Sequence, residues 1–343
     1  MAKKESEKKD APAAERKLRL GFIGCGGIMN MHVDNLKGSQ SEIVALADPS
    51  PQSLERMKSR HAHLKDVPTF SCWHKLLESV ALDAVEIGSP HTVHYEQICA
   101  ALEKGLHVLC EKPMTCTSAH ARDVLARAKK AKRVVGISYQ RHFGGTYRFL
   151  RELVTTGRLG EVQFVQAYQA QEWLKATKGS WRQQKALSGG GQLNDSGSHL
   201  IDMVMWTTGL TAAEVSCRSE FFGTEVDINS AVNVKFSNGA LGTIAVVGNA
   251  PSWWEDFTIV GSEGAVYNRN GKVTYQLGMC GPVSELVRGV DWMNPDKNFV
   301  GAILGKCAIG CPPEIGLRVI ELTEAAWRSH EQNGAPVKVE AGG

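Results

Sequence analysis

The sequence has no long apolar run: no stretch of its 343 residues approaches the roughly 18 apolar residues that a membrane-spanning helix needs. Proline is scarce, with 12 residues, and the composition of 43% hydrophobic and 22% charged residues is that of a folded globular protein. The nine cysteines are odd in number and scattered, and no apolar export signal precedes them, so a disulfide scaffold is not expected. We therefore expect a soluble, cytoplasmic protein with reduced thiols and no membrane partner.

The chain also lacks a strong excess of charge of either sign. It has 39 basic and 36 acidic residues, and residues 1–19 hold seven of the basic and four of the acidic ones, which leaves 32 of each. A balanced body gives no electrostatic reason to expect a nucleic acid as partner. Residues 1–17 are charged and contain no apolar segment of signal-peptide length, so we interpret them as a disordered leader.

The first half predicts a nucleotide-binding fold. Short apolar runs alternate with helical segments, which is the pattern of consecutive βαβ units. The runs are 18–24, 43–47, 84–88, 107–110 and 134–138, and the main helical segments are 51–63, 93–104 and 118–130. We expect an α/β Rossmann domain with a doubly wound parallel sheet over residues 18–142.

The second half has a different rhythm and predicts an α+β domain over residues 143–312. A helix, a strand, and a glycine-rich loop with its helix come first, and six short strands separated by turn signals follow. These segments are 147–156, 162–170, 188–208, 214–222, 231–236, 241–247, 257–260, 265–268 and 273–277. Such a pattern indicates a large, mainly antiparallel sheet, and we expect one of its faces to be open for self-association. Two late helices, 298–304 and 313–329, follow, and we expect residues 313–343 to pack back on the N-terminal domain.

A glycine turn, residues 24–29, ends the first apolar run. Glycine suits position 24 because the turn is tight, and it suits position 26 because the backbone can then approach a pyrophosphate. Met29 stands where a small residue is usual, so the helix must repack against the strand. Asp48, which ends the second run, can accept hydrogen bonds from both ribose hydroxyls, and no cation follows it, which favours NAD over NADP. The alternative is an ordinary turn and an aspartate that caps the helix beginning at residue 51.

A lysine follows the strand predicted over residues 107–110, in the motif Glu111-Lys112-Pro113. Ligands of open α/β sheets lie beyond the carboxyl ends of the strands, so Lys112 is expected to face the crevice. An ammonium group there would stabilise an alkoxide. The alternative is a solvent-exposed lysine at the end of a strand.

A second candidate segment begins with three glycines, Gly189–Gly191, and continues with Asp195, His199 and Asp202. On a helix, Asp195 and His199 would share one face, and Asp202 would follow on the same side. An imidazole beside a carboxylate suits general acid–base catalysis. The alternative is that Asp195 caps the helix and His199 fills a polar gap.

The sequence lacks the residues that other dehydrogenase and acyl-transfer mechanisms require. Only Cys307 and Cys311 are close together, and no histidines accompany them at zinc-site spacing, so no metal is expected. No tyrosine has a lysine four residues later, as short-chain dehydrogenases require, and no G-x-S-x-G elbow is present.

In order and spacing, these motifs resemble the glucose-fructose oxidoreductase/inositol dehydrogenase (Gfo/Idh/MocA) family. Further matching segments are 139–141, 158–162, 261–264 and 316–326, so the resemblance covers about residues 18–340. It implies a Rossmann domain, a C-terminal domain with an open sheet, and dimers or tetramers formed through that sheet. It also implies NAD(P)-dependent oxidation or reduction of sugars, polyols and their derivatives, in carbohydrate metabolism. His91 departs from the family, which often has asparagine there.

The resemblance implies Lys112, Asp195 and His199 as the catalytic set. For the cofactor NAD, we expect contacts from the turn and from strand ends, namely Gly24, Gly26, Gly27, Ile28, Met29, Asp48, Ser89, His91, His94, Glu111, Lys112 and Gln140. For the substrate, we expect contacts from Arg141, Glu172, Trp173, Trp181, Arg182, Asp195 and His199. Trp253, Trp254 and Trp292 are further stacking candidates, and one or two of the five tryptophans are expected to touch a sugar.

The predicted reaction is hydride transfer between NAD(H) and a hydroxyl-bearing carbon. His199 takes the hydroxyl proton, Lys112 stabilises the incipient alkoxide, and Asp195 fixes His199. Two alternatives remain open: redox-assisted glycoside cleavage in which bound NAD is recycled, and a non-catalytic NAD-binding sugar sensor.

Overall fold

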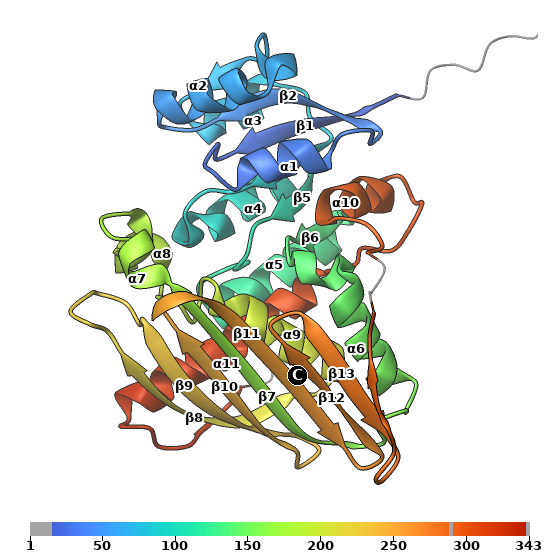
Figure 1. Ribbon diagram of the computed structural model, residues 1–343. Helices are drawn as coiled ribbons and strands as arrows, with labels where there is room; N and C mark the ends of the chain where they lie inside the picture. The colour runs from blue at the N-terminus through green and yellow to red at the C-terminus, as the bar shows by residue number, and fades with distance from the viewer. Residues whose placement is uncertain (1–15, 288–290, 341–343) are drawn as a thin grey trace, which may run out of the picture.

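The computed structural model describes residues 16–287 and 291–340, so the predicted leader lies almost wholly outside the described residues. The chain forms two parts, an N-terminal α/β domain and a C-terminal part dominated by one large sheet (Figure 1). Among the described residues, no helix is both long enough and apolar enough to cross a bilayer.

The described N-terminal domain has a six-stranded parallel sheet in the order β3-β2-β1-β4-β5-β6. Its strands are β1 (Leu18–Ile23), β2 (Ser41–Ala47), β3 (Thr69–Phe70), β4 (Ala84–Ile87), β5 (His107–Cys110) and β6 (Val135–Ile137). The helices are α1 (Met29–Asn35), α2 (Pro51–Arg60), α3 (Trp73–Ser79), α4 (His94–Glu103) and α5 (Ser118–Ala131). The strand order reverses between β1 and β4, where ligands of doubly wound sheets bind. The predicted Rossmann architecture is confirmed.

The C-terminal sheet has nine strands among the described residues, in the order β14-β13-β12-β11-β7-β10-β9-β8-β15. They are β7 (Val162–Glu172), β8 (Ala212–Glu220), β9 (Asn229–Phe236), β10 (Leu241–Val247), β11 (Asn249–Gly261), β12 (Gly264–Arg269), β13 (Lys272–Leu277), β14 (Val283–Glu285) and β15 (Val337–Lys338). β10 pairs with β7 in parallel, and the other described pairs are antiparallel. The predicted mainly antiparallel sheet is therefore confirmed.

One face of this sheet is covered by helices. They are α6 (Gly145–Thr155), α9 (Gly197–Thr208) and α11 (Pro313–Glu331), and Figure 1 shows α9 and α11 behind the strands. Side chains of β9 alternate between buried and exposed, as expected when only one face packs on a core. The other face is open in this chain, and Phe164 and Leu241 pair across neighbouring strands there with 38% and 54% exposure.

The last helices return to the N-terminal domain. α10 (Pro295–Ile303) contacts α1, and α11 contacts α5 as well as β8 and α9. Cys311, just before α11, accepts a hydrogen bond of 3.0 Å from the Ile137 N–H on the edge strand β6. The end of the chain thus completes the cover of the first domain.

The glycine-rich segment between the domains contains turns rather than one helix. Two short helices, α7 (Trp173–Ala176) and α8 (Lys185–Ser188), precede it, and α9 begins only at Gly197. Residues 189–196 therefore form a loop that reaches toward the ends of the strands of the N-terminal sheet.

Candidate functional site

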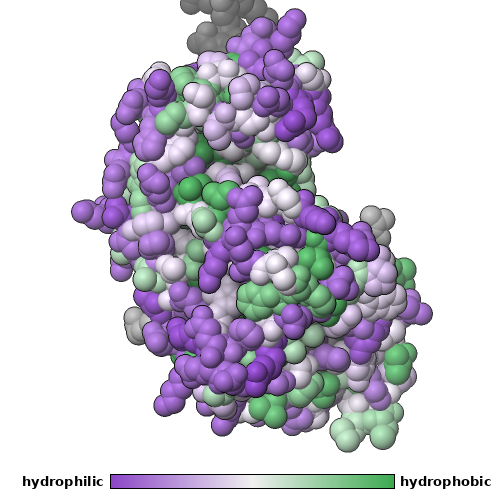
Figure 2. All heavy atoms as spheres, turned by 90° about the vertical axis from the view of Figure 1, so that its left-hand side faces the viewer, coloured by the Kyte–Doolittle hydropathy of each residue, from purple (hydrophilic) through white to green (hydrophobic). Residues whose placement is uncertain are grey.

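A cleft of about 100 Å³ lies between the two parts of the chain. Of the predicted site residues, it is lined by Ile28, Ser89, His91, Glu111, Lys112, Gln140, Trp181, Arg182 and His199. The surface view shows a hollow at the junction of the upper and lower parts (Figure 2). The structure therefore brings together residues that the sequence placed on separate strands, loops and helices.

The glycine turn leaves open space in front of α1. Gly24 has a positive φ of 84°, and a β-carbon there would lie 2.7 Å from backbone atoms of Gly88 and Ser89, so only glycine fits. At Gly26 and Gly27, by contrast, a β-carbon would meet no atom within 4 Å. This open backbone is what a pyrophosphate needs for close approach.

Met29 is accommodated by a glycine on the neighbouring strand end. Its side chain is fully buried, and its Sδ lies 2.3 Å from the point where a β-carbon of residue 88 would stand. Gly88 therefore makes room for the bulky residue, and this is the repacking that the sequence required. The prediction that Met29 contacts the cofactor does not hold for its side chain, which lies in the core beneath the turn.

Asp48 is tied to the glycine turn. Its Oδ2 accepts a hydrogen bond of 2.7 Å from the Cys25 N–H, and its Oδ1 accepts one of 2.8 Å from the Ser50 N–H. The cap of α2 is Ser50, whose hydroxyl accepts from the Ser53 N–H, so the capping role considered for Asp48 is wrong. Each carboxylate oxygen keeps a further lone pair for a ribose hydroxyl.

Lys112 and Asp195 meet across the cleft. The Lys112 Nζ donates to Asp195 Oδ1 at 2.7 Å, and Trp173 Nε1 and Arg182 Nε donate to Oδ2 at 2.9 and 3.0 Å. Asp195 is only 4% exposed. Burial raises the pKa of its carboxyl group, but the positive charges of Lys112 and Arg182 outweigh burial and lower it. Asp195 is therefore an anion that holds two cations at the cleft.

The helical pairing expected for Asp195 and His199 does not form. Asp195 lies in the loop before α9, and Ser198 Oγ donates to its backbone oxygen at 2.7 Å. Its carboxylate is bound by Lys112, Trp173 and Arg182, as described above, rather than by the imidazole. Asp202 was expected on the same side and instead binds the buried His142 Nε2 at 2.9 and 3.0 Å.

His199 lines the cleft as a neutral imidazole. Its ring packs edge-on against Tyr139, with 5.6 Å between ring centroids, and its Nδ1 has no hydrogen-bond partner among residues 16–287 and 291–340. Burial lowers the pKa of His199 well below its usual value, and the positive charges of Lys112 and Arg141 lower it further. A neutral imidazole can accept a proton from a bound hydroxyl group.

His91 joins the N-terminal domain to the glycine-rich segment. Its Nδ1 donates to the Ser188 carbonyl at 3.1 Å, and its Nε2 lies 3.8 Å from Asp195 Oδ1. Burial lowers the pKa of His91 to about 3, so the ring is uncharged at neutral pH. Its edge packs against Trp181, with 4.7 Å between centroids.

His94 does not line the cleft, contrary to expectation. Its two ring nitrogens lie 2.9 Å from the carbonyl oxygens of Pro113 and Ser89, and the side chain is fully buried. It therefore braces the two strand-end loops that carry the cleft residues Ser89 and Lys112.

The carboxylate of Glu111 is bound by protein groups. Its Oε1 lies 3.1 Å from His32 Nε2, and its Oε2 accepts from the Lys112 N–H at 3.1 Å. The other ring nitrogen of His32 lies 2.6 Å from Asp296 Oδ1, with Glu86 Oε2 at 3.6 Å. Among the described residues, His32, Glu86 and Asp296 are the one group of His, Cys, Asp and Glu ligand atoms close enough to share a metal ion, and the hydrogen bond between His32 and Asp296 joins two of the three. Glu111 thus holds the backbone N–H of Lys112 and also lines the cleft.

The predicted substrate residues divide into two groups. Trp181 and Arg182 line the cleft, with the guanidinium of Arg182 4.6 Å from the Trp181 ring centre. Arg141 is held at 2.6 Å by Glu255, a partner that no sequence signal revealed. Glu172 does not reach the cleft, because it is 47% exposed and pairs with Lys175 at 3.3 Å.

The other tryptophans lie away from the cleft. Trp173 is buried behind it as the donor to Asp195. Trp253 and Trp254 are half-exposed on β11, and Trp292 stacks against Phe143 at 5.9 Å. Trp181 is therefore the tryptophan in position to contact a ligand directly.

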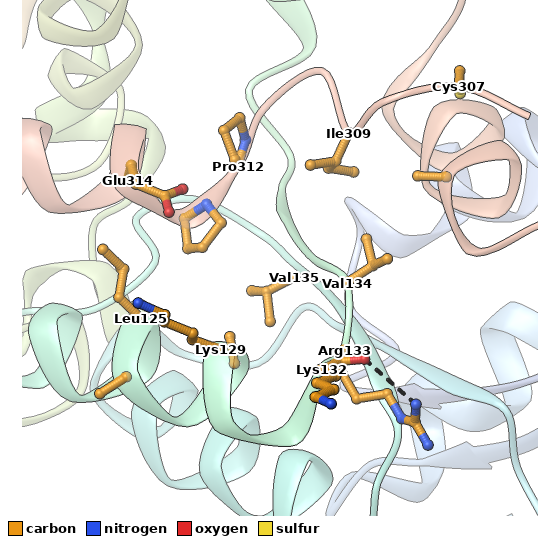
Figure 3. Close-up of a pocket in the computed structure, with 14 residues that line it drawn as sticks. Leu125, Lys129, Lys132, Arg133, Val134, Val135, Cys307, Ile309, Pro312 and Glu314 are labelled. Atoms are coloured by element: carbon orange, nitrogen blue, oxygen red, sulfur yellow. Dashed lines mark hydrogen bonds between the residues drawn. The ribbon is translucent and has the colours of Figure 1, made fainter. Parts of the chain in front are cut away.

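A larger cavity of about 590 Å³ lies between α5 and residues 307–314 (Figure 3). Its lining is mostly aliphatic, with Val134, Val135 and Ile309 facing it, and it includes none of the predicted site residues. Arg133 beside it is engaged with the Lys132 carbonyl at 3.4 Å. The smaller cleft between the domains is therefore the candidate site.

Two family descriptions match consecutive parts of the chain. The description "Oxidoreductase family, NAD-binding Rossmann fold" matches residues 18–139, and "GFO/IDH/MocA C-terminal domain" matches residues 147–267. The chain belongs to the Gfo/Idh/MocA family. Its N-terminal domain is an NAD-binding Rossmann domain, as predicted, and the chain is an oxidoreductase by family.

Individual Gfo/Idh/MocA relatives include sugar and polyol dehydrogenases. D-Glucoside 3-dehydrogenase of Escherichia coli K12 is 32% identical over 202 residues, 57% of this chain and 56% of that protein, so the match spans little more than half of that relative. Myo-inositol 2-dehydrogenase of Thermotoga maritima is 27% identical over 75% of this chain and 77% of its own. A levoglucosan dehydrogenase solved with NADH shares the fold, with a TM-score of 0.82 at 20% identity over 94% of this chain and 99% of its own.

Proposed function

We propose that this protein transfers a hydride between NAD(H) and a hydroxyl-bearing carbon of a sugar, polyol or glycoside. The observation that carries the proposal is the convergence of Lys112 and His199 on one cleft beside the glycine turn, with Asp195 bound to the Lys112 ammonium group. An ammonium group, an anion that holds it, and a neutral imidazole are the groups that metal-free alcohol oxidation needs.

The residues of the first domain fit the dinucleotide. The open backbone at Gly26 and Gly27 would receive the pyrophosphate, and the Asp48 carboxylate would accept from the ribose hydroxyls. When bound, NAD supplies the hydride acceptor and NADH the donor. The turn and Asp48 are already linked through the Cys25 N–H, so the two contacts are set in one geometry.

The residues around the cleft handle the proton and the charge. In oxidation, neutral His199 would accept the proton of the substrate hydroxyl, and bound NAD would supply the acceptor for the hydride from the carbon that bears this hydroxyl. The Lys112 ammonium, held by Asp195, stabilises negative charge that develops on the oxygen. In reduction, protonated His199 returns the proton to the oxygen of the carbonyl group.

The cations around the cleft in the described residues already have carboxylate partners. Lys112 and Arg182 share the carboxylate of Asp195, and Arg141 is paired with Glu255. Trp181 lines the cleft, and an aromatic side chain there supports a hydroxylated ring compound as substrate.

The test is a panel of sugars, polyols and glycosides incubated with NAD and NADP, followed by absorbance at the NADH band and by product mass. We expect NADH to accumulate with at least one neutral compound, and His199→Ala to abolish turnover while NADH still binds. Normal activity of His199→Ala would remove the mechanism. Hydrolysed glycoside without accumulated NADH would instead support redox-assisted cleavage.

We also propose that the open sheet face, defined by Phe164 and Leu241, is where copies of the chain associate. These two apolar side chains are neighbours and are exposed on this face, and contact with a second copy of the chain would bury them. Leu241→Lys is expected to lower the molecular mass measured by sedimentation, and an unchanged mass would contradict this interface.

A further inference from the structure

The loop that carries Asp195 is bound by a buried aspartate outside the cleft. Asp227 lies between β8 and β9 and is 3% exposed. Its Oδ1 accepts from the Gly191 N–H and from Trp327 Nε1, both at 3.0 Å, and its Oδ2 accepts from the Leu193 N–H at 2.8 Å. Its backbone oxygen accepts from the Gln192 N–H at 2.8 Å. Three consecutive residues of the loop are therefore bound to Asp227.

The contact between the loop and Asp227 leaves no space. A β-carbon at Gly191 would lie 1.8 Å from the Asp227 carbonyl oxygen, so only glycine fits at that position. On the other side, a β-carbon at Gly190 would lie 2.3 Å from the ring of Trp327 on α11. The loop is thus held between Asp227 and the last helix of the chain.

Asp227 has no ion-pair partner among residues 16–287 and 291–340. A buried carboxylate without a cation is costly unless hydrogen-bond donors satisfy it. Here two loop N–H groups and one indole N–H, all directed at the carboxylate, provide that satisfaction. The binding of the loop and the burial of Asp227 therefore depend on each other.

The position of the loop determines where Asp195 lies at the cleft. The Asp195 N–H donates to the Gly191 carbonyl at 3.0 Å, and the Asp195 carboxylate binds Lys112 Nζ at 2.7 Å. We propose that Asp227 is a positioning residue that sets the distance between Asp195 and Lys112. This inference rests on the proposed function, and it adds a residue that touches neither substrate nor cofactor.

The main test is Asp227→Asn, which replaces one acceptor oxygen with an NH₂ group facing N–H donors. We expect kcat to fall about 10- to 100-fold, as for other misplacements of a catalytic group. The dissociation constant of NADH, measured by fluorescence, should stay within about twofold, because the glycine turn and Asp48 lie on the other domain. A crystal structure of the variant should show Lys112 Nζ and Asp195 Oδ1 beyond hydrogen-bond distance.

The control is Ser329→Ala. Ser329 is buried on the same helix as Trp327. Within the described part of the chain, its hydroxyl accepts from the Cys217 N–H at 2.8 Å and donates to the Ala335 carbonyl at 2.7 Å, and neither hydrogen bond involves the loop. The Ser329→Ala variant should have a lower melting temperature and an unchanged kcat. Equal loss of kcat in Ser329→Ala and Asp227→Asn at equal loss of melting temperature would overturn the proposal.

A milder variant covers the case in which Asp227→Asn does not fold. Trp327→Phe removes one of the three donors and keeps an aromatic ring over Gly190, so a several-fold drop in kcat with unchanged NADH affinity is expected. An unaltered kcat would overturn the proposal. The Lys112–Asp195 distance can be measured in a crystal of either variant without an activity assay. A protein that oxidises no sugar in the panel would contradict the proposed function, whereas an unchanged distance in the variants would contradict the positioning role.

Discussion

Lys112 Nζ lies 2.7 Å from Asp195 Oδ1, although 83 residues separate them in sequence. The lysine follows a strand of the nucleotide-binding domain and the aspartate lies in a loop of the second part. This ion pair therefore joins the two halves of the chain at the cleft where a ligand would bind.

Lys112→Met keeps the length of the side chain and removes its charge. We expect kcat to fall at least about 100-fold, because the group that stabilises the developing alkoxide is gone. NADH affinity should change little, as measured by fluorescence titration. Lys175→Met, at an exposed lysine of the same region, is the control, and equal activities of the two variants would contradict the role of Lys112.

Asp48→Ser should weaken NAD and shift preference toward NADP. The substitution removes the ribose acceptor and the acceptor of the Cys25 N–H, and it takes away the charge that would repel a 2′-phosphate. We expect NADH affinity to fall about tenfold or more, and the ratio of NADPH to NADH affinity to rise, in parallel titrations. An unchanged ratio of NADPH to NADH affinity would show that Asp48 does not bind the ribose hydroxyls.

Gly88→Ala should destabilise the fold through Met29. The new β-carbon would stand 2.3 Å from the Met29 Sδ, and such overpacking costs about 1–3 kcal/mol. Met29→Ala alone should cost about 2–5 kcal/mol through the cavity it leaves. In urea denaturation, the double variant should lose less free energy of unfolding than the two single variants together, and simple additivity would contradict direct packing.

Arg141→Gln should move the acid limb of the pH profile. The pKa of His199 is lowered by burial and by the charges of Lys112 and Arg141, so in the native protein the rate of oxidation should fall only below pH 6.5. Removing Arg141 removes one lowering charge and leaves Glu255 as an unpaired anion, so the pKa of His199 rises. The acid limb of the pH profile of kcat/KM for oxidation should therefore shift to higher pH. Arg148→Gln, at an arginine over Trp292, should leave it in place.

The regular elements were predictable where the sequence period was clear. The segments predicted over 241–247, 118–130 and 313–329 match β10, α5 and α11 to within two residues at each end. The segment predicted over 257–260 is only the end of β11, which begins at Asn249, because a proline and two exposed tryptophans obscure the alternation there. Two-residue strands such as β3 and β15 carry no periodic signal and form only because a longer strand lies beside them.

The site was predictable in its members and less so in its contacts. Strand ends and glycine loops placed Lys112 and Asp195 near one crevice, because the topology of such sheets brings strand ends together. The partners of Asp195 and the burial of Glu111 depend on long-range contacts that leave no local pattern. Asp227 and Glu255 were missed for the same reason: one lies in a loop and the other in a strand, with no motif around either, and the importance of each comes from residues far away in sequence.

The hydrogen bond from Ile137 to Cys311 and the packing of α11 on α5 have a consequence for biosynthesis. While the ribosome is still translating the middle of the message, the first domain has all its own strands but an uncovered sheet edge and an uncovered helix flank. Only the emergence of residues 311–331 from the ribosome can close them, so a nascent polypeptide stalled before that point would expose a strand edge that favours aggregation.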